Sequence, residues 1–174
     1  MHEKTLKSKR VYSGRLLGLR EDEVKMATGK VSRREICEHP GAVAIIAVTD
    51  KKEIVLIRQF RKPAEKVLLE VPAGLYKRGE DLKEAAKREL EEETGFTAGK
   101  ISPVFSAYTS PGYSTELLHY FLAEKLKKTA QCYEEDEDII VDILPINKAF
   151  EMAKQGKIED NKTIVGITIA KWMI

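Results

Sequence analysis

Residues 74–96 carry a dense group of carboxylates, three of which are spaced to act together on a cation. Glu89, Glu92 and Glu93 fall within two turns of one predicted helix. Helical periodicity places Glu89 and Glu93 on the arc that carries the apolar Leu82, away from the solvent side. Like charges one turn apart repel each other, and more strongly against apolar surface. The pattern favours a positive partner over a solvated Glu/Lys helix: basic side chains, or a hard cation such as Mg²⁺ or Mn²⁺.

The borders of this helix are also visible in the sequence. Asp81 is a suitable N-cap, and Glu84 three residues later completes a capping-box pattern. Gly95 supplies a C-terminal stop. We therefore expect a helix between Asp81 and Gly95, preceded by a loop that contains Gly74.

The same residues resemble the signature of the Nudix hydrolases. Gly74, Glu80 and the run from Arg88 to Phe96 match that signature at every fixed position. The resemblance implies an ion pair between Glu80 and Arg88. It also implies a metal site, whose ligands would be the carbonyl of Ala73 and the carboxylates of Glu89, Glu92 and Glu93, with Glu93 counted among the catalytic residues as well.

Length and composition indicate a protein with one full core and no nucleic-acid footprint. The chain has 174 residues, 43% of them hydrophobic, and its 30 basic and 28 acidic side chains nearly balance. The first residues lack the apolar core of a signal peptide, and residues 42–48 are too short an apolar run to span a membrane. Cys37 and Cys132 are expected to be reduced thiols. We expect a cytoplasmic protein with neither a membrane nor a nucleic-acid partner.

The N-terminal region is predicted to form a small antiparallel sheet. Residues 11–19, 21–26 and 31–37 are typical of strands, but they carry few large apolar side chains, so this sheet needs a partner surface. The sequence is similar to the ADP-ribose pyrophosphatase group of the Nudix family, in which such a sheet packs across a homodimer interface. This divides the chain into an N-terminal segment, 1–39, and a hydrolase domain, 40–174.

Two arginines are candidates for binding the substrate. From its spacing alone, Arg34 could equally be a ligand-binding residue or a solvated residue at a strand edge. For Arg61, spacing alone favours an exposed charge at the end of a strand over ligand binding. The resemblance assigns both to the ligand, with Arg61 on its diphosphate. A guanidinium suits that task because its planar fork pairs two phosphate oxygens at once.

Two further positions are linked to the substrate less directly. Glu70 precedes the loop at Ala73 and belongs either to the substrate or metal shell or to a structural hydrogen bond. Pro111 has an ordinary explanation as a turn residue. However, it lies sixteen residues after Gly95, and in the resembled group that spacing marks ADP-ribose-type substrates.

The run of five acids at 134–138 is typical of a solvated loop. A mobile carboxylate is also what a hydrolase needs to take a proton from the attacking water. In similar enzymes a glutamate of such a loop has this role, so Glu135 is our first candidate for the catalytic base and Glu137 the second.

The remaining patterns complete an α/β fold. Strands are expected over 41–48, 53–57, 101–109, 116–125 and 139–144. Helices are expected over 147–155 and 161–172, and both are expected to cover the sheet. Trp172 is expected in the core or an interface rather than as an adenine platform. The resemblance names the fold: a Nudix α/β/α sandwich with a mixed sheet, preceded by the small N-terminal antiparallel sheet.

Together these features predict a metal-dependent hydrolase of ADP-ribose that releases AMP and ribose 5-phosphate. Another diphosphate remains an alternative substrate, such as a nucleotide sugar, a dinucleoside polyphosphate or a flavin dinucleotide. A nucleotide-binding sensor without activity is the alternative from another class, and the complete set of box carboxylates argues against it.

Overall fold

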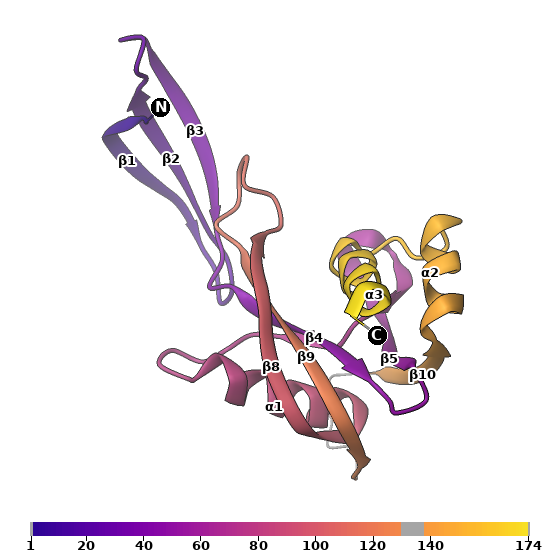
Figure 1. Ribbon diagram of the computed structural model, residues 1–174. Coiled ribbons are helices and arrows are strands. Elements are labelled where there is room, and N and C mark those ends of the chain that lie inside the picture. Colours follow the sequence, from indigo (N-terminus) through magenta and orange to yellow (C-terminus); the bar gives the residue numbers. More distant parts are fainter. Residues whose placement is uncertain (1, 130–137, 174) are drawn as a thin grey trace. The chain divides into compact units, whose positions relative to one another are not determined.

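The computed structural model describes residues 2–129 and 138–173. The chain divides into two compact units. The first contains residues 1–41 and 107–118, and the second contains residues 42–106 and 119–174. Figure 1 shows the order of the elements along the chain. Their bounds are β1 Lys4–Ser13, β2 Gly18–Lys25, β3 Val31–Glu38, β4 Ala42–Val48, β5 Glu53–Arg61, η1 Lys62–Ala64, β6 Lys66–Glu70, β7 Ala73–Gly74, α1 Leu82–Thr94, β8 Phe96–Tyr108, β9 Leu117–Lys128, β10 Ile139–Pro145, α2 Ile146–Lys154 and α3 Asn161–Met173.

The first unit is built on a three-stranded antiparallel sheet in the order β1-β2-β3. Every residue of β1 is exposed. Large apolar side chains of this unit also lie in solvent: Leu6, Val11, Tyr12, Leu16, Leu17, Leu19 and Val31. The sheet therefore has little core of its own, as its composition predicts.

One predicted strand in this unit is wrong. The pattern over residues 11–19 predicts a single extended segment, but β1 ends at Ser13 and β2 begins at Gly18. The N–H of Gly14 donates to the carbonyl of Leu17 over 2.8 Å and closes the turn between them. The sequence contains a signal for this turn, Ser13-Gly14, which the predicted strand ignored.

The second unit is organised around a sheet with the strand order β10-β5-β4-β9-β8, to which β6 and β7 pair at β5 and β4. Every residue of β4 is buried. Val43, Ile45 and Ala47 share a core cluster with the helix α1. Ile46 faces α3 instead, where it lies beside Gly166. Because side chains alternate across a strand, helices cover both faces of β4.

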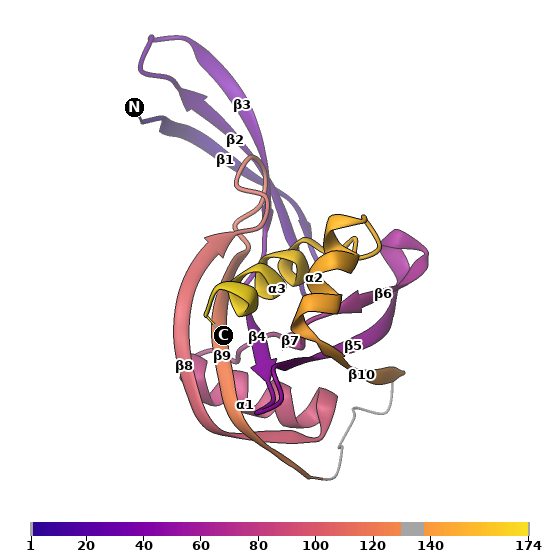
Figure 2. The same ribbon diagram turned by 45° about the vertical axis from the view of Figure 1, so that its right-hand side comes forward.

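The two late helices lie side by side in Figures 1 and 2 and pack on each other. Both begin and end within two residues of the predicted bounds. The prediction for Trp172 is corrected in part, because its side chain is 78% exposed and so is not in the core. The second unit is thus a layered α/β structure, with a helix layer on each side of its central strand, as the sequence predicts.

No helix in the described part of the chain is both long enough and apolar enough to cross a membrane. Cys37 is a free thiol, as expected, and Cys132 lies outside the described residues.

Candidate active site

The helix α1 carries the carboxylates, and its local sequence explains where it begins and ends. Asp81 is the N-cap, and its side chain accepts hydrogen bonds from the backbone N–H groups of Lys83 and Glu84. At the other end, Gly95 takes the left-handed conformation with φ 66°. That conformation strains any residue with a Cβ, which explains the glycine at this helix stop.

The buried face of α1 includes an acid. Ala85, Ala86, Leu90 and Thr94 line this face, and Glu93 lies among them at 4% exposure. This confirms the prediction that Glu93 belongs to the apolar arc. A buried carboxylate is costly unless it is paired or hydrogen-bonded, so its surroundings must supply donors.

One donor to Glu93 comes from the loop that precedes the helix. The N–H of Ala73 donates to Oε2 of Glu93 over 2.9 Å. Ala73 and Gly74 form β7, which pairs with Val43 and Ala44 of β4. The loop is therefore held between the central strand and the carboxylate of Glu93.

Glu89 approaches the same loop at Gly74. A Cβ at position 74 would collide with the Glu89 carboxylate in its present position, so a larger residue would have to displace this carboxylate. Close approach, and not an unusual backbone angle, therefore favours glycine at position 74. The loop and two of the helix carboxylates form one compact group.

Arg88 connects the remaining carboxylates. Its Nη1 donates to Glu89 over 2.6 Å and to Glu92 over 2.9 Å. On its other side, Nε and Nη2 donate to the two oxygens of Glu80 over 3.0 and 3.2 Å. Nη2 also donates to the carbonyl of Leu75 over 3.0 Å. The predicted ion pair between Glu80 and Arg88 is therefore confirmed, and it joins the loop to the helix.

This cluster changes the pKa of both partners of that ion pair. Hydrogen bonds from Arg88 and from the backbone of Lys77 lower the pKa of Glu80 below its ordinary value. The hydrogen bond to Glu80, followed by those to Glu89 and Glu92, raises the pKa of Arg88. Both groups stay charged near neutral pH.

The predicted metal ligands fit a hard cation by their chemistry. Three carboxylates from one helix and a nearby backbone carbonyl form an all-oxygen donor set. The absence of a Cβ at Gly74 leaves room for the Glu89 carboxylate beside the loop. Among the described residues, however, no three His, Cys, Asp or Glu side chains are arranged to hold a metal ion. Arg88 donates to Glu89 and Glu92 in this structure. The assignment of these ligands stays a prediction.

A second cluster surrounds Glu70. Nε and Nη2 of Arg61 each donate to one oxygen of its carboxylate over 2.8 Å. Nζ of Lys162 donates to Oε2 of the same carboxylate and lies 3.2 Å from Asp160 Oδ1. The Glu70 side chain is 1% exposed. It acts in this structure as a structural hydrogen-bond acceptor, one of the two interpretations that the sequence leaves open.

The charges of this cluster determine the protonation of Glu70. Burial by itself raises the pKa of a carboxyl group, but the hydrogen bond from Arg61 and the charge and hydrogen bond of Lys162 outweigh it, so the pKa of Glu70 is lowered. The hydrogen bond to Glu70 raises the pKa of Arg61, with smaller contributions from the charges of Glu93 and Asp160. Arg61 thus lies within electrostatic range of the buried acid of α1.

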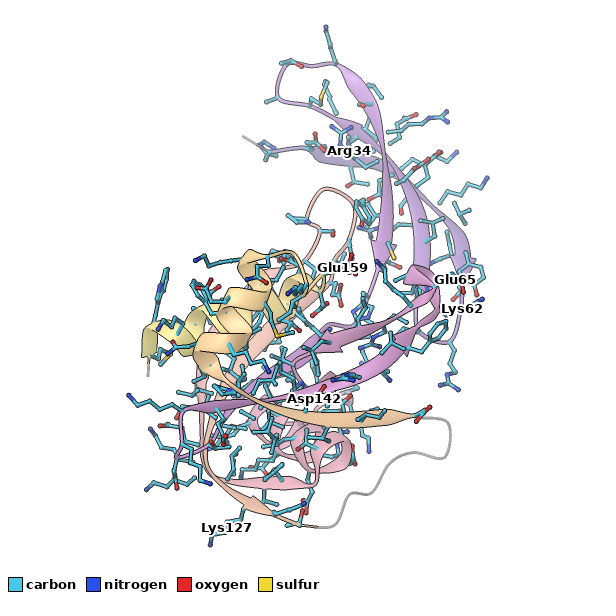
Figure 3. All side chains as sticks on the ribbon, turned by 90° about the vertical axis from the view of Figure 1, so that its right-hand side faces the viewer. Arg34, Lys62, Glu65, Lys127, Asp142 and Glu159 are labelled. Carbon is cyan, nitrogen blue, oxygen red and sulfur yellow. The ribbon has the colours of Figure 1, made fainter. Side chains whose placement is uncertain are left out.

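Arg34 and Pro111 belong to the first unit, while Arg61, Glu70, Ala73 and the box carboxylates belong to the second. Arg34 projects from the three-stranded sheet, as labelled in Figure 3. Its Nε donates to Glu3 over 3.0 Å and its Nη2 over 2.5 Å. Pro111 lies in the turn after β8. Glu135 and Glu137 lie outside the described residues.

Sequence reasoning missed Lys162 and Asp160. Asp160 caps α3, because Oδ2 accepts from the N–H of Thr163 over 2.9 Å. An Asp directly before a helical pattern is a recognisable cap signal, so the helix start was readable. The contact between Lys162 and Glu70 was not readable, because it joins residues 92 positions apart.

Comparison with known proteins finds two family models along the chain. A family model of the NUDIX domain matches residues 38–165. A second model, the nucleoside diphosphate sugar hydrolase N-terminal domain, matches residues 3–40.

Individual relatives cover nearly the whole chain. The ADP-ribose pyrophosphatase of Bacillus subtilis (strain 168) is 41% identical over 169 residues, which are 96% of this chain and 91% of that protein. The methanol dehydrogenase activator of Bacillus methanolicus is 42% identical over 167 residues, which are 95% of this chain and 90% of that protein.

A solved structure described as an ADP compounds hydrolase superposes with a TM-score of 0.87 and 22% identity, over 99% of this chain and 95% of that one. This likeness establishes the shared fold. The predicted fold class is thereby confirmed. The NUDIX domain model covers well over half of the sequence, and residues 74–96 carry the complete signature. The chain belongs to the Nudix hydrolase family.

Proposed function

We propose that this Nudix hydrolase cleaves the diphosphate of ADP-ribose and releases AMP and ribose 5-phosphate. The observation that carries the proposal is the compact group of Glu89, Glu93 and the loop at Ala73 and Gly74, with Arg61 in electrostatic range. The 41% identity to an ADP-ribose pyrophosphatase over 96% of the chain supports the choice of substrate.

In this proposal Glu89, Glu92, Glu93 and the carbonyl of Ala73 would hold a divalent cation, Mg²⁺ or Mn²⁺. Such a cation supplies positive charge for the diphosphate oxygens and lowers the pKa of a bound water. Glu93 is buried against the loop, which fixes its carboxylate before any ligand binds. A fixed ligand group needs no reorganisation during the reaction, and this is the main source of electrostatic catalysis.

The remaining site residues have separate roles. Arg61 contacts the diphosphate through the part of its guanidinium that Glu70 does not engage. Arg34 of the first unit holds another part of the ligand. Glu135, or Glu137 in its place, removes a proton from the attacking water. Pro111 is assigned to substrate binding because its spacing from Gly95 is the one that marks ADP-ribose-type substrates in the resembled group. Rate enhancement then comes chiefly from positioning and charge stabilisation.

The substrate assignment is tested by steady-state kinetics on a panel of diphosphates. ADP-ribose is compared with nucleotide sugars, dinucleoside polyphosphates and flavin dinucleotides, each with MgCl₂ and with chelator. The proposal predicts the highest kcat/KM for ADP-ribose and no turnover with chelator. A higher kcat/KM for another diphosphate would keep the chemistry and reject the substrate.

A nucleotide sugar is the second candidate substrate. The match of residues 3–40 to a nucleoside diphosphate sugar hydrolase N-terminal domain favours it over the other diphosphates. A sensor that binds nucleotides without cleaving them is the remaining alternative. Binding of ADP-ribose without turnover of any panel member, at every metal tested, would support the sensor.

A role toward a protein partner is a further candidate. One relative, 42% identical over 95% of this chain, is named a methanol dehydrogenase activator. The role is tested by adding the chain and MgCl₂ to a methanol dehydrogenase. A rise in its turnover would support a function as an activator, and unchanged turnover would count against it.

We also propose a cytoplasmic homodimer that associates through the three-stranded sheet. Exposed apolar side chains of this sheet, such as Val11, Tyr12 and Leu19, are the observation in favour. Burial of apolar surface is the main driving force of association. A partner sheet would cover these side chains and give the first unit the core that it lacks.

A further inference from the structure

The buried carboxylate of Glu70 is held by two cations at once. Arg61 grips it with Nε and Nη2, one donor to each oxygen, over 2.8 Å. Lys162 reaches Oε2 from the first turn of α3. A carboxylate with one partner can swing about its own bonds, whereas one held by partners on two elements is fixed. The orientation of Glu70 therefore depends on α3.

The same geometry fixes Arg61. Its guanidinium uses Nε and Nη2 on Glu70, and its side chain remains 39% exposed. Glu70 does not engage Nη1 of Arg61, so this edge of the guanidinium can serve a phosphate oxygen. Because the guanidinium is planar, the direction of Nη1 follows from the position of Glu70.

Lys162 is itself held by α3 and the loop. Its Nζ lies 3.2 Å from Asp160 Oδ1. Oδ2 of Asp160 accepts hydrogen bonds from the N–H and the hydroxyl of Thr163 over 2.9 and 2.5 Å. The Thr163 hydroxyl also accepts from the N–H of Val71 over 2.7 Å, one residue after Glu70. A continuous chain of contacts thus runs from the start of α3 to Glu70.

Close packing supports this connection. Gly166 lies one helical turn after Thr163, and a Cβ at this position would approach Val71 Cγ1 at 3.1 Å. The helix α3 and Val71, the residue after Glu70, are thus closely packed. A shift of α3 would therefore displace Val71 and the adjoining Glu70, because closely packed interiors transmit displacements.

We propose that Lys162 is a positioning residue for diphosphate binding, which acts through Glu70 on the guanidinium of Arg61. The inference rests on the proposed function, in which Arg61 contacts the diphosphate. The Lys162 side chain is 14% exposed, and both of its ion-pair partners are acids of this cluster. It therefore orients Arg61 and does not contact the substrate itself.

The charge of the cluster supports the same role. Lys162 and Arg61 together carry two positive charges, and Glu70 and Asp160 carry two negative ones. Removal of the Lys162 ammonium leaves a buried carboxylate with one cation, and part of its charge becomes uncompensated. The carboxylate then turns toward other donors, and Arg61 moves with it.

The test compares Lys162→Met with a matched control, Lys66→Met. Lys66 also joins β6 to the start of α3, since its Nζ donates to both oxygens of Glu159 over 2.9 and 2.8 Å. Figure 3 labels Glu159, directly before the cap of α3. The two variants lose the same charge, but only Lys162→Met removes a contact of Glu70. Steady-state kinetics with the diphosphate that the wild type prefers, and the Tm of each variant, are the measurements.

We expect Lys162→Met to raise KM about tenfold, the value of one hydrogen bond to a charged group. We expect kcat to stay within about threefold, because the metal carboxylates are untouched. Lys66→Met should change neither. In an Arg61→Ala background, Lys162→Met should have no further effect on KM, because Lys162 affects the substrate only through the orientation of Arg61. A purely structural role predicts an equal rise in KM with and without Arg61, and this result would overturn the inference.

Two additions keep the test decisive. If Lys162→Met fails to fold, Lys162→Gln retains a donor near Glu70 and is expected to raise KM by a smaller factor. An unchanged KM in either folded variant overturns the inference.

Calorimetric titration of inorganic pyrophosphate with MgCl₂ needs no turnover, so it separates this inference from the proposed function. Pyrophosphate binding that weakens in Lys162→Met and not in Lys66→Met supports the inference even if no diphosphate is cleaved. Absence of pyrophosphate binding by the wild type overturns it.

Discussion

Arg61 and Glu70 form a bidentate ion pair, in which Nε and Nη2 of the guanidinium donate to the two oxygens of the carboxylate. Arg34 makes the same kind of contact with Glu3. This geometry is also the one in which a guanidinium binds a phosphate. The difference lies in burial, because Glu70 is enclosed while Glu3 is partly exposed. A ligand can replace Glu3 at low cost, but Glu70 is a permanent part of the structure.

A first prediction concerns Glu93. The substitution Glu93→Gln removes the charge but keeps the shape of a side chain that is 4% exposed. We expect kcat to fall by about a hundredfold or more, a loss typical of removing one electrostatic contact to the transition state. The measurement is turnover of ADP-ribose with MgCl₂, with circular dichroism to show that the fold is retained.

The matched control is Glu84→Gln on the same helix. The Glu84 side chain is 61% exposed and pairs with Lys87. Its loss should leave turnover unchanged, since exposed pairs contribute little. If Glu93→Gln kept wild-type turnover with MgCl₂, the assignment of the metal ligands would be wrong.

A second prediction concerns the ion pair between Glu80 and Arg88. The substitution Arg88→Lys removes the planar group that serves Glu80, Glu89, Glu92 and the carbonyl of Leu75 together. A lysine cannot reach all four, so we expect the free energy of unfolding to fall by about 1–3 kcal/mol. Urea denaturation without metal measures it. A variant as stable as the wild type would show that the cluster does not hold the loop to the helix.

A third prediction uses the lowered pKa of Glu70. A carboxyl group whose pKa is lower in the folded than in the unfolded protein stabilises the fold above its unfolded pKa. That contribution is lost as the pH falls through the lower, folded pKa. We expect Glu70→Gln to cost about 1–3 kcal/mol at pH 7, because Arg61 and Lys162 lose a charged acceptor.

Urea denaturation at a series of pH values tests this. The difference in unfolding free energy between wild type and Glu70→Gln should be constant from pH 7 to pH 6 and should shrink below the ordinary Glu pKa of 4.5. A difference that grows as the pH falls would contradict the direction of the shift.

A fourth prediction concerns assembly. The substitution Val11→Glu places a charge among the exposed apolar side chains of the first unit. If this sheet forms the dimer interface, the charge is desolvated on association and the dimer dissociates. Light scattering after size exclusion should give the mass of two chains for the wild type and of one chain for the variant.

Lys51→Glu, in the exposed turn between β4 and β5, is the control and should stay dimeric. A wild type that elutes as a monomer at all concentrations would exclude the proposed dimer.

The sequence alone predicts the local features of the site well. The cap at Asp81, the stop at Gly95 and the burial of Glu93 follow from periodicity and from capping chemistry, which act over a few residues. The ion pair of Glu80 and Arg88 was expected from the resemblance to the Nudix signature, and the structure contains it.

Contacts between distant segments could not be predicted in this way. Lys162 meets Glu70 only because α3 packs on the strand β4 and the adjoining loop. Nothing in the local pattern of either residue specifies the other. The exposure of Trp172 was misjudged for the same reason, since burial at a helix end depends on what packs there.

The most direct test of the central claim is a ³¹P NMR spectrum of ADP-ribose incubated with the wild-type protein and MgCl₂. The account predicts that the diphosphate signals are replaced by the monophosphate signals of AMP and ribose 5-phosphate. It further predicts that chelator prevents this change and that Glu93→Gln slows it by about a hundredfold or more. A diphosphate spectrum that stays unchanged with wild-type protein and MgCl₂, or cleavage that continues in chelator, would contradict the account.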